Sequence, residues 1–538
     1  MTSDENAWYR QIGIVDQNGV ASLDKTIDGD DDGIVSLLVM SDQLGAFRSG
    51  RGSVRINRDP EKRIRLDLSR GFVNPLPMSW LEVKEYFSGR GMSVHFDHNA
   101  TKIDLWVGKS SCINGATSAE IWAVHGNGRA LLGSGSTQDV PRAKPPRTML
   151  DPASLVCCTA SILHRLLAKE GLFWKEAVSD RWLTLTVRVD DLDPSDALEE
   201  ISSEFGRGTS ALTADGSGSL IRFRIPVEKT PFELVDVLHQ SRIEPDHTGT
   251  GISDIGPIPA VSEDGRISFS GEPVPALLTE GDFLILGAGG TGSWASSLIL
   301  GGCDNGVSIT IIDGDAQVEK HNLNRQVLYQ NEDLGKPKAD AAKVALTRRF
   351  PEYSTGITSI PIHLGPHHTS TSSLDENEEM SFEAISACGS DHNQRVRTSL
   401  DDMGVALACL DNQAARTWLN KACLERGKAM VNGGSEGLMG VVECFEGDSC
   451  MVCRYGEREA TSSEVVSCQE EGTRPVPSIV TSTAYVGAMM AAMALCVVAR
   501  ERSEMATIPP DRNWSSGAVQ IRQPGRLPWF DGGCLSHL

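Results

Sequence analysis

Residues 282–292 read DFLILGAGGTG, a short apolar run that ends in a cluster of glycines. The run is typical of a buried strand, and Gly287, Gly289 and Gly292 have the GxGxxG spacing that precedes a helix. Glycines at such a turn let backbone N–H groups and the helix N-terminus approach a phosphate. The stretch therefore predicts a phosphate-binding α/β domain. The spacing alone leaves the ligand open, and a glycine-rich turn without a ligand also fits it.

The sequence around this turn alternates between strand-like and helix-like segments. A helix is predicted over SWASSLILGG (293–302) and a second strand over VSITIIDGD (307–315). Later strands are predicted over VALACLDN (405–412) and AMVNGG (429–434). Such alternation indicates a mostly parallel sheet with helices on its faces, as in Rossmann-like domains.

The composition limits the classes of protein. The chain has 538 residues, of which 40% are hydrophobic and 23% charged, and this length suits about two to four domains. The formal net charge of −22 argues against a protein that binds nucleic acid through its phosphates, because that task needs a basic field.

Other features of the composition concern the compartment. The N-terminus lacks the basic start and apolar core of a signal peptide. The apolar run Ala484–Ala499 is too short to span a membrane and predicts a buried helix. With 13 cysteines and no secretory signal, we expect mostly reduced thiols, a cytoplasmic location and no membrane partner.

The first half of the chain is less regular. Strands are predicted over 102–108 and 120–128, and another over RWLTLTVRVDDLD (181–193). The segment 151–171 has caps and apolar periodicity suited to a helix that packs on a sheet. In the second half, the polar stretch 363–380 predicts an exposed and mobile insertion.

The segment after the second strand decides between two ligands. An acid at the end of that strand, Asp313, can bind a ribose hydroxyl of a dinucleotide or of ATP. A hydride-transfer site has no need for many cations near the phosphates, whereas a site that expels pyrophosphate from ATP does, since negative charge grows on the leaving group. Polar and basic residues follow in an ordered string: Asn322, Arg325, Gln326, Lys336 and Lys338.

Taken together, the motifs GAGGTGS, IIDGD, NLNRQ, GKPKADAA, LDNQAAR, VNGGSEGLMG and CMVC resemble the adenylation domain of the ubiquitin-activating enzyme superfamily. This superfamily includes ThiF-type adenylyltransferases that activate sulfur-carrier proteins. The resemblance covers residues 282 to about 499. It implies that ATP and magnesium are used to adenylate the C-terminal glycine of a ubiquitin-fold protein.

The resemblance assigns roles to single residues. Asp313 would bind the ribose, and Asp411 of LDNQAAR would bind magnesium. This sequence has one more residue between Asp315 and Asn322 than bacterial members of the family, which bears on the role of Asn322. The remaining nucleotide contacts implied are Gly287, Gly289, Gly290, Gly292, Asn322, Arg325, Gln326 and Lys338, with Arg325 and Lys338 acting in catalysis.

Two short cysteine motifs predict a metal site. Cys450 and Cys453 have the spacing of two zinc ligands on one turn, and Cys534 and His537 at the C-terminus have the same spacing. Together they would complete a tetrahedral Cys3His zinc site that fastens the chain terminus to the domain. The family commonly has four cysteines in these places, so His537 would be a substitution. Four further cysteines of this half lie in apolar contexts and are expected in the core: Cys303, Cys409, Cys423 and Cys444.

The resemblance also suggests a reason for the first half. In the family, adenylation domains work in pairs, and residues 1–275 resemble a decayed, inactive copy that lacks a glycine loop, followed by an active domain over 276–538. The segment WYRQIGIV resembles the N-terminal segment from which an arginine reaches the partner's ATP. Arg10 is then a candidate arginine finger.

A last cysteine, Cys468, lies in a polar stretch where the family places its acceptor cysteine. The interpretation is therefore a fused inactive–active enzyme that forms a thioester with a ubiquitin-like protein and passes it to a conjugating enzyme. It most resembles enzymes of bacterial ubiquitin-like conjugation systems, including antiphage operons. A sulfur-carrier adenylyltransferase, an NAD-dependent oxidoreductase and a non-catalytic scaffold are the alternatives. The carrier, the final target and the oligomeric state stay open.

Overall fold

The structure is a computed structural model that covers parts of both predicted halves. It describes residues 23–113, 118–138, 140–142, 147–170, 182–188, 210–214, 220–226, 252–263, 266–269, 274–362, 391–411, 413–447, 450–452, 478–502, 508–509, 511–515 and 518–521. The predicted insertion at 363–380 lies outside these residues.

The second half of the chain forms an eight-stranded sheet that begins at the quoted stretch. Its order is β15-β14-β13-β16-β17-β18-β19-β20. The parallel strands are β13 (Gly281–Leu286), β14 (Val307–Ile312), β15 (Ile357–Ile360), β16 (Val405–Ala408) and β17 (Ala429–Glu436). Antiparallel strands continue the sheet: β18 (Met439–Phe445), β19 (Arg512–Ser515) and β20 (Ala518–Ile521). The predicted parallel sheet is thus confirmed.

Helices cover both faces of this second sheet. Phe283 and Ile285 of β13 point into a core shared with α7 (Gly290–Gly301), α8 (Lys338–Arg349) and α14 (Val480–Arg502). The alternate residues Leu284 and Leu286 point into a second core with α10 (Asp391–Asp402) and α11 (Gln413–Leu424). This alternation follows from the period of two in a strand. The described part of this half also contains the short 3-10 helices η3 (Lys320–Asn322), η4 (Asn331–Asp333) and η5 (Pro351–Tyr353).

The first half forms a seven-stranded sheet of order β10-β6-β5-β4-β1-β2-β3. Its strands are β1 (Asp24–Gly29), β2 (Ser53–Ile56), β3 (Val94–Phe96), β4 (Ile103–Lys109), β5 (Ser118–Gly126), β6 (Arg129–Ser136) and β10 (Ser253–Asp254). The helices among the described residues of this half are α1 (Asp31–Leu44), η2 (Arg70–Phe72), α2 (Trp80–Gly89) and α3 (Asp151–Lys169). The strands from β1 to β5 are parallel, and β6 and β10 are antiparallel to their neighbours.

The two sheets repeat one topology. In each, the first strand lies third from one edge, the second and third strands extend to that edge, and the fourth, fifth and antiparallel sixth extend to the other side. α1 and α7 follow the first strand of their sheets, and α3 and α14 are the long helices after the sixth. The first half is therefore an α/β domain of the same architecture as the second.

The sequence did not indicate every element of the first half. The predictions at 102–108, 120–128 and 151–171 correspond to β4, β5 and α3, and 181–193 contains β7 (Trp182–Arg188). Helix α1 was missed because nearly all of it is buried, so it lacks the polar face of an amphipathic helix. β7 joins β8 (Ser210–Ala214) and β9 (Leu220–Pro226) in a separate sheet, and β11 (Val261–Glu263) pairs with β12 (Arg266–Ser268).

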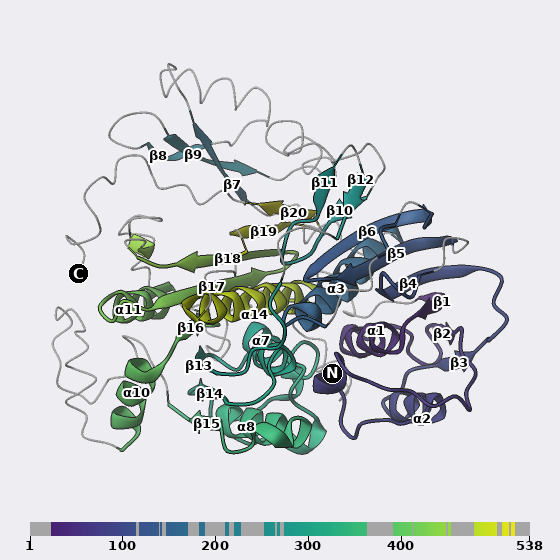
Figure 1. The fold of residues 1–538 in the computed structure, drawn as a ribbon, viewed down its shortest axis with the longest axis horizontal. Coiled ribbons are helices and arrows are strands. Elements are labelled where there is room, and N and C mark those ends of the chain that lie inside the picture. The colour runs from purple at the N-terminus through teal and green to yellow at the C-terminus, as the bar shows by residue number, and fades with distance from the viewer. Residues whose placement is uncertain are drawn as a thin grey trace.

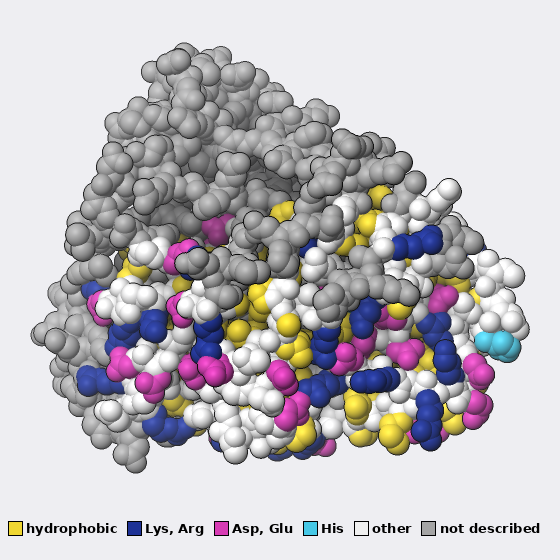
Figure 2. Space-filling model, in the orientation of Figure 1, with side chains coloured by type: hydrophobic (Ala, Val, Ile, Leu, Met, Phe, Trp, Pro, Cys, Tyr) yellow, Lys and Arg dark blue, Asp and Glu magenta, His cyan; other side chains and the backbone are white. Residues whose placement is uncertain are grey.

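One hydrophobic core joins the two halves. It contains Ile27 and Leu38 of the first half and Ile285 and Met489 of the second. Helix α14 runs through the centre of the molecule and packs against α3 and α7 (Figure 1). The helix α14 is longer than the apolar run Ala484–Ala499, and by length and composition it could cross a membrane. Its apolar stretch is entirely buried in this core, which confirms the predicted buried helix. On the face seen in Figure 2, basic and acidic side chains are interspersed over the described residues.

Candidate nucleotide site

The glycine loop connects β13 to α7 at the carboxyl edge of the second sheet. Gly287 has a φ of 93°, which favours glycine, and a Cβ there would lie 2.3 Å from the carbonyl oxygen of Cys409. A Cβ on Gly292 would lie 1.9 Å from the carbonyl oxygen of Gly287. These two glycines are therefore required by the packing of the loop itself.

Gly289 and Gly290 lie in different surroundings. Within 4 Å of a Cβ on Gly289, the only described atom is Nε2 of Gln326, at 4.0 Å. Gly289 is the N-cap of α7, and no described side chain caps this helix. A Cβ on Gly290 would lie 2.8 Å from Cγ2 of Thr483 in α14. The loop thus packs on the protein at Gly290 and is open at Gly289, where an anion can approach the helix N-terminus.

Asp313 lies beside the loop, directly after β14. Its Oδ2 accepts the N–H of Ala288 at 2.6 Å, and its Oδ1 accepts the N–H of Asp315 at 2.8 Å. Burial raises the pKa of this carboxyl, while the Lys338 ammonium opposes that rise. Lys338 is the first residue of α8, and its ammonium pairs with the carboxylate of Asp315. The structure therefore brings Asp313 and Lys338 together, as the sequence predicted, and adds Asp315 as a counter-ion.

The string of polar residues after β14 is mostly buried. Arg325 is 7% exposed and donates from Nη1 to the carbonyl oxygen of His321 at 2.7 Å and to Oδ1 of Asn324 at 3.0 Å. Among the described residues, Oε1 of Gln326 and Nδ2 of Asn324 are buried without a hydrogen-bond partner. Buried polar atoms usually have a partner, so these two fit a site that receives a polar ligand.

Asn322 and Asp411 complete the predicted set. Oδ1 of Asn322 accepts the N–H of Glu319 at 2.8 Å and caps η3, so its oxygen has a structural role that the sequence did not indicate. Asp411 is exposed, three residues beyond the end of β16. The buried Arg416 donates to the carbonyl oxygens of Leu410 and of Gly433, the latter at 3.0 Å, and so holds the segment that carries Asp411.

Comparison with known proteins identifies this half of the chain. Residues 264–513 match the ThiF family. The second half is a ThiF-family domain. It thereby belongs to the superfamily that contains the ubiquitin-activating enzymes, as the motifs predicted. The predicted glycine loop, Asp313 and the polar string from Asn322 to Lys338 all lie within this domain.

Relatives of the ThiF domain have several activities in their names. The molybdopterin-synthase adenylyltransferase of Escherichia coli is 29% identical over 194 residues, which cover 35% of this chain and 65% of that protein. The adenylyltransferase and sulfurtransferase UBA4 of Kluyveromyces lactis is 30% identical over 198 residues, or 36% of this chain and 37% of that one. The ubiquitin-activating enzyme E1 1 of Candida albicans is 27% identical over 182 residues, or 33% and 15%.

The matches thus span between 15% and 65% of the length of these relatives. Among solved structures, that of E. coli MccB with ATP covers 47% of this chain and 66% of its own, at 20% identity and a TM-score of 0.33. That TM-score is too low to carry an argument about the site.

Strand register relates the first sheet to the ThiF domain. Gly29 is the last residue of β1, and Gly287 directly follows β13. A Cβ on Gly29 would meet the carbonyl oxygen of Val107 on the neighbouring strand, and a Cβ on Gly287 would meet that of Cys409 in the same way. Counted from these glycines, three charged residues of the first half take the places of residues of the nucleotide site. Asp30 takes the place of Ala288, Arg58 that of Asp313, and Lys109 that of Asp411.

Two of these replacements, Arg58 and Lys109, reverse the charge at their positions, and Asp30 places an acid where the ThiF domain has alanine. Asp30 caps α1, where it accepts the N–H of Gly33 at 2.7 Å and the N–H of Lys109 at 2.6 Å. A carboxylate of the chain therefore lies at the helix N-terminus, where the ThiF domain is open. Arg58 donates to the carbonyl oxygen of Gly29 and pairs with Asp28. The first half has a glycine at this turn, but not the glycine-rich loop.

Several predicted residues lie outside the described residues: Arg10, Cys453, Cys468, Cys534 and His537. Of the four predicted zinc ligands, only Cys450 is described, and it is buried. Within the described residues, no group of three or more His, Cys, Asp or Glu side chains could hold a metal ion. The zinc site stays a prediction. Of the predicted core cysteines, Cys303, Cys409 and Cys423 are buried, whereas Cys444 is half-buried.

Proposed function

We propose that this chain uses ATP to adenylate the C-terminal glycine of a ubiquitin-like protein. The observation that carries the proposal is the opening at Gly289, at the N-terminus of α7, next to a carboxylate at Asp313 and cations at Arg325 and Lys338. The names of the relatives support adenylation of a carrier protein. An NAD-dependent oxidoreductase has no use for this group of cations, and a scaffold has no use for a complete nucleotide site.

Each residue has a role in this proposal. The open N–H groups of the glycine loop bind phosphate oxygens, and Asp313 binds the ribose. When bound, ATP supplies an electrophilic α-phosphorus and a pyrophosphate leaving group, and magnesium held by Asp411 supplies further positive charge. Arg325 and Lys338 are fixed cations that stabilise the negative charge growing on the leaving group. Asp315 holds Lys338 at the site through their ion pair.

The first half, residues 1–275, is in this proposal an inactive copy paired with the active domain over 276–538. The shared strand order supports the pairing. The side chain of Asp30 already accepts the N–H groups of Gly33 and Lys109, so these donors at the α1 N-terminus are not available to a phosphate. Lys109 and Arg58 cannot replace a metal-binding and a ribose-binding acid. Each chain therefore binds one nucleotide. Arg10 is proposed to reach that nucleotide as an arginine finger.

The finer steps concern residues outside the described ones. We assign to Cys468 the acceptor thiolate, which attacks the acyl carbonyl carbon while AMP leaves. The thioester then passes to a conjugating-enzyme-like partner. A sulfur-carrier adenylyltransferase is the second candidate, favoured by the names of two relatives, and it would stop without a thioester relay. We further propose one structural zinc on Cys450, Cys453, Cys534 and His537, measurable by elemental analysis.

The test is ATP–pyrophosphate exchange with candidate ubiquitin-like proteins. We expect exchange that depends on the carrier and that Asp411→Ala lowers by about a thousandfold or more, because the metal loses its ligand. Asp402→Ala, which removes an exposed carboxylate in α10, is the matched control and should exchange at the wild-type rate. Exchange unaffected by Asp411→Ala would refute the metal assignment, and no exchange with any carrier would refute the function.

A further inference from the structure

A short segment of the first half lies directly against the ThiF domain. We call residues 70–74, which contain η2, the strap. Its preceding residues are fixed by Asp32 of α1, whose Oδ1 accepts the N–H groups of Asp67, Leu68 and Ser69 at 2.9, 2.9 and 2.8 Å. It also accepts the Ser69 hydroxyl at 2.8 Å. The start of the strap is therefore held firmly by the first half.

The strap contacts the predicted phosphate-binding residues through one buried tryptophan. The ring of Phe72 packs on that of Trp294 in α7, with 5.1 Å between centroids and an interplanar angle of 57°. Both side chains are buried. Nε1 of Trp294 donates to the carbonyl oxygen of Arg325 at 3.1 Å. The main chain of Arg325 is thus linked to the strap by one ring contact and one hydrogen bond.

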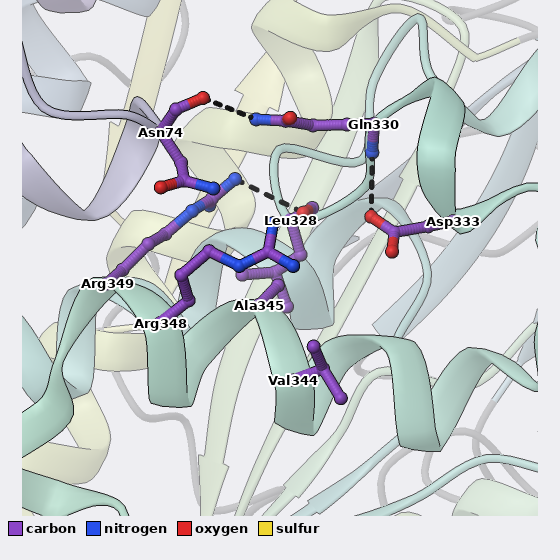
Figure 3. A pocket seen from close by; sticks show the side chains of 8 residues that line it. All are labelled: Asn74, Leu328, Gln330, Asp333, Val344, Ala345, Arg348 and Arg349. Carbon is purple, nitrogen blue, oxygen red and sulfur yellow. Dashed lines mark hydrogen bonds between the residues drawn. The ribbon is translucent and has the colours of Figure 1, made fainter.

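Two further hydrogen-bonded links follow along the strap. Arg349 of α8 donates from Nη1 to the carbonyl oxygen of Gly71 at 2.7 Å and from Nη2 to those of Val327 and Leu328 at 2.9 and 3.1 Å. Nε2 of Gln330 donates to the carbonyl oxygen of Asn74 at 3.1 Å. Figure 3 shows Arg349 reaching Leu328, and Gln330 reaching Asn74.

The close approach depends on a glycine. A Cβ on Gly71 would lie 2.8 Å from Cζ of Phe350, which follows α8. The same carbonyl oxygen of Gly71 also lies 3.5 Å from the hydroxyl of Ser297 in α7. The strap therefore lies between α7 and α8, the two helices whose N-termini carry the glycine loop and Lys338.

On its other side, the segment 325–330 contacts the nucleotide site. The hydroxyl of Tyr329 lies 2.9 Å from the carbonyl oxygen of Ala288 in the glycine loop and 3.1 Å from that of Lys338. The segment is thus held between the strap and the loop. A shift of the strap would be transmitted to Arg325, to the loop and to the first residue of α8.

We propose that the strap is a positioning element for adenylation, with Phe72 fixing Arg325 through Trp294. The proposal rests on the proposed function of the ThiF domain. A cation stabilises a transition state best when it is already in place, because no reorganisation is then needed during the reaction. Supporting contacts outside the site matter for the same reason, since a displacement of about 1 Å can cost on the order of 100-fold in rate.

The test uses the full chain with Phe72→Ala and a matched control. Phe269→Ala also removes a buried ring, 2% exposed against 3% for Phe72, but from the cluster on the face of the first sheet opposite α3. We expect Phe72→Ala to lower kcat of pyrophosphate exchange by about 10- to 100-fold with a smaller change in KM for ATP. Phe72→Leu should recover part of kcat, and Phe269→Ala should keep wild-type kcat.

Hydrogen exchange of the same variants, without substrate, separates this proposal from the proposed function. We expect the backbone amides of residues 325–330 to exchange faster in Phe72→Ala and in Gln330→Ala than in Phe269→Ala. Equal exchange in Phe72→Ala and Phe269→Ala would overturn the positioning role, whatever the enzyme activity. Faster exchange at 325–330 with unchanged kcat would restrict the strap to a structural contact and also overturn it.

Discussion

The glycine loop offers a clean separation of ligand binding from folding. Gly289 and Gly292 are three residues apart, and both can be changed to alanine. The new methyl at Gly289 would meet only Nε2 of Gln326, at 4.0 Å, among the described atoms. The backbone there, with φ of −75° and ψ of −147°, lies just outside the extended region that alanine prefers. The methyl at Gly292 would lie 1.9 Å from a backbone oxygen of the same loop. The two variants should therefore fail in different ways.

The magnitudes follow from these contacts. Gly289→Ala should change the free energy of unfolding by no more than about 1 kcal/mol, because the smaller number of unfolded conformations of alanine opposes the cost of this backbone conformation. Its methyl group would prevent phosphate oxygens from reaching the N–H groups of the loop. Loss of one charge-assisted hydrogen bond costs about 1.5–3 kcal/mol, or about 10- to 150-fold in ATP affinity. Gly292→Ala must move backbone and should cost about 1–3 kcal/mol of folding stability or more.

Thermal unfolding and calorimetric titration with ATP measure the two effects separately. We expect a Tm within about 1 °C of the wild type and weak ATP binding for Gly289→Ala. For Gly292→Ala we expect a lower Tm, by about 1 °C per kcal/mol, because the unfolding entropy grows with length and one core joins the two halves of the 538-residue chain. Wild-type ATP affinity in Gly289→Ala would refute the assignment of phosphate to this loop. A normal Tm in Gly292→Ala would refute the packing argument.

Three further predictions concern other parts of the chain. Equilibrium dialysis should find one ATP per chain, and a second, weaker nucleotide would contradict the closed site at Asp30. Burial lowers the pKa of His125 to about 4, and Asp151, Lys109 and Asp32 are the charges that face it. The folded state therefore binds fewer protons than the unfolded state. The free energy of unfolding present above pH 6.5 thus falls by about 3 kcal/mol as the pH falls toward 4. His125→Gln should remove this pH dependence in denaturant titrations across that range. Cys468→Ala should still support pyrophosphate exchange but form no thiol-sensitive adduct, and an adduct as abundant as in the wild type would exclude this cysteine.

The sequence predicted the features that are local in the chain. The glycine loop, Asp313 and the first residue of α8 each follow a strand or begin a helix, so short patterns are enough to place them. The alternation of strands and helices then implies that these residues meet at one edge of a parallel sheet. For the same reason α3, with its apolar periodicity and caps, was placed within a few residues of its observed bounds.

The features that the sequence did not indicate depend on register or on distant contacts. That Lys109 takes the place of Asp411 follows only when the strand pairings of both sheets are known. The contact between Phe72 and Trp294 joins residues more than two hundred positions apart, in two different domains. Arg416 lies in the recognised motif LDNQAAR, but the carbonyl groups that it binds, and so its role in holding the segment of Asp411, are known only from the structure.

The acid at Asp30 and the position of the strap both depend on helix α1. In the ThiF domain, no side chain of the described residues caps the helix N-terminus after the glycine loop, so a bound anion can stabilise it. In the first half, the side chain of Asp30 accepts the N–H of Gly33, so α1 is capped whether or not nucleotide is present. A permanently ordered α1 keeps Asp32 in place, and Asp32 holds the residues that begin the strap. If the first half binds no nucleotide, as we propose, its capped α1 would provide a fixed support for Arg325 before ATP binds to the other half.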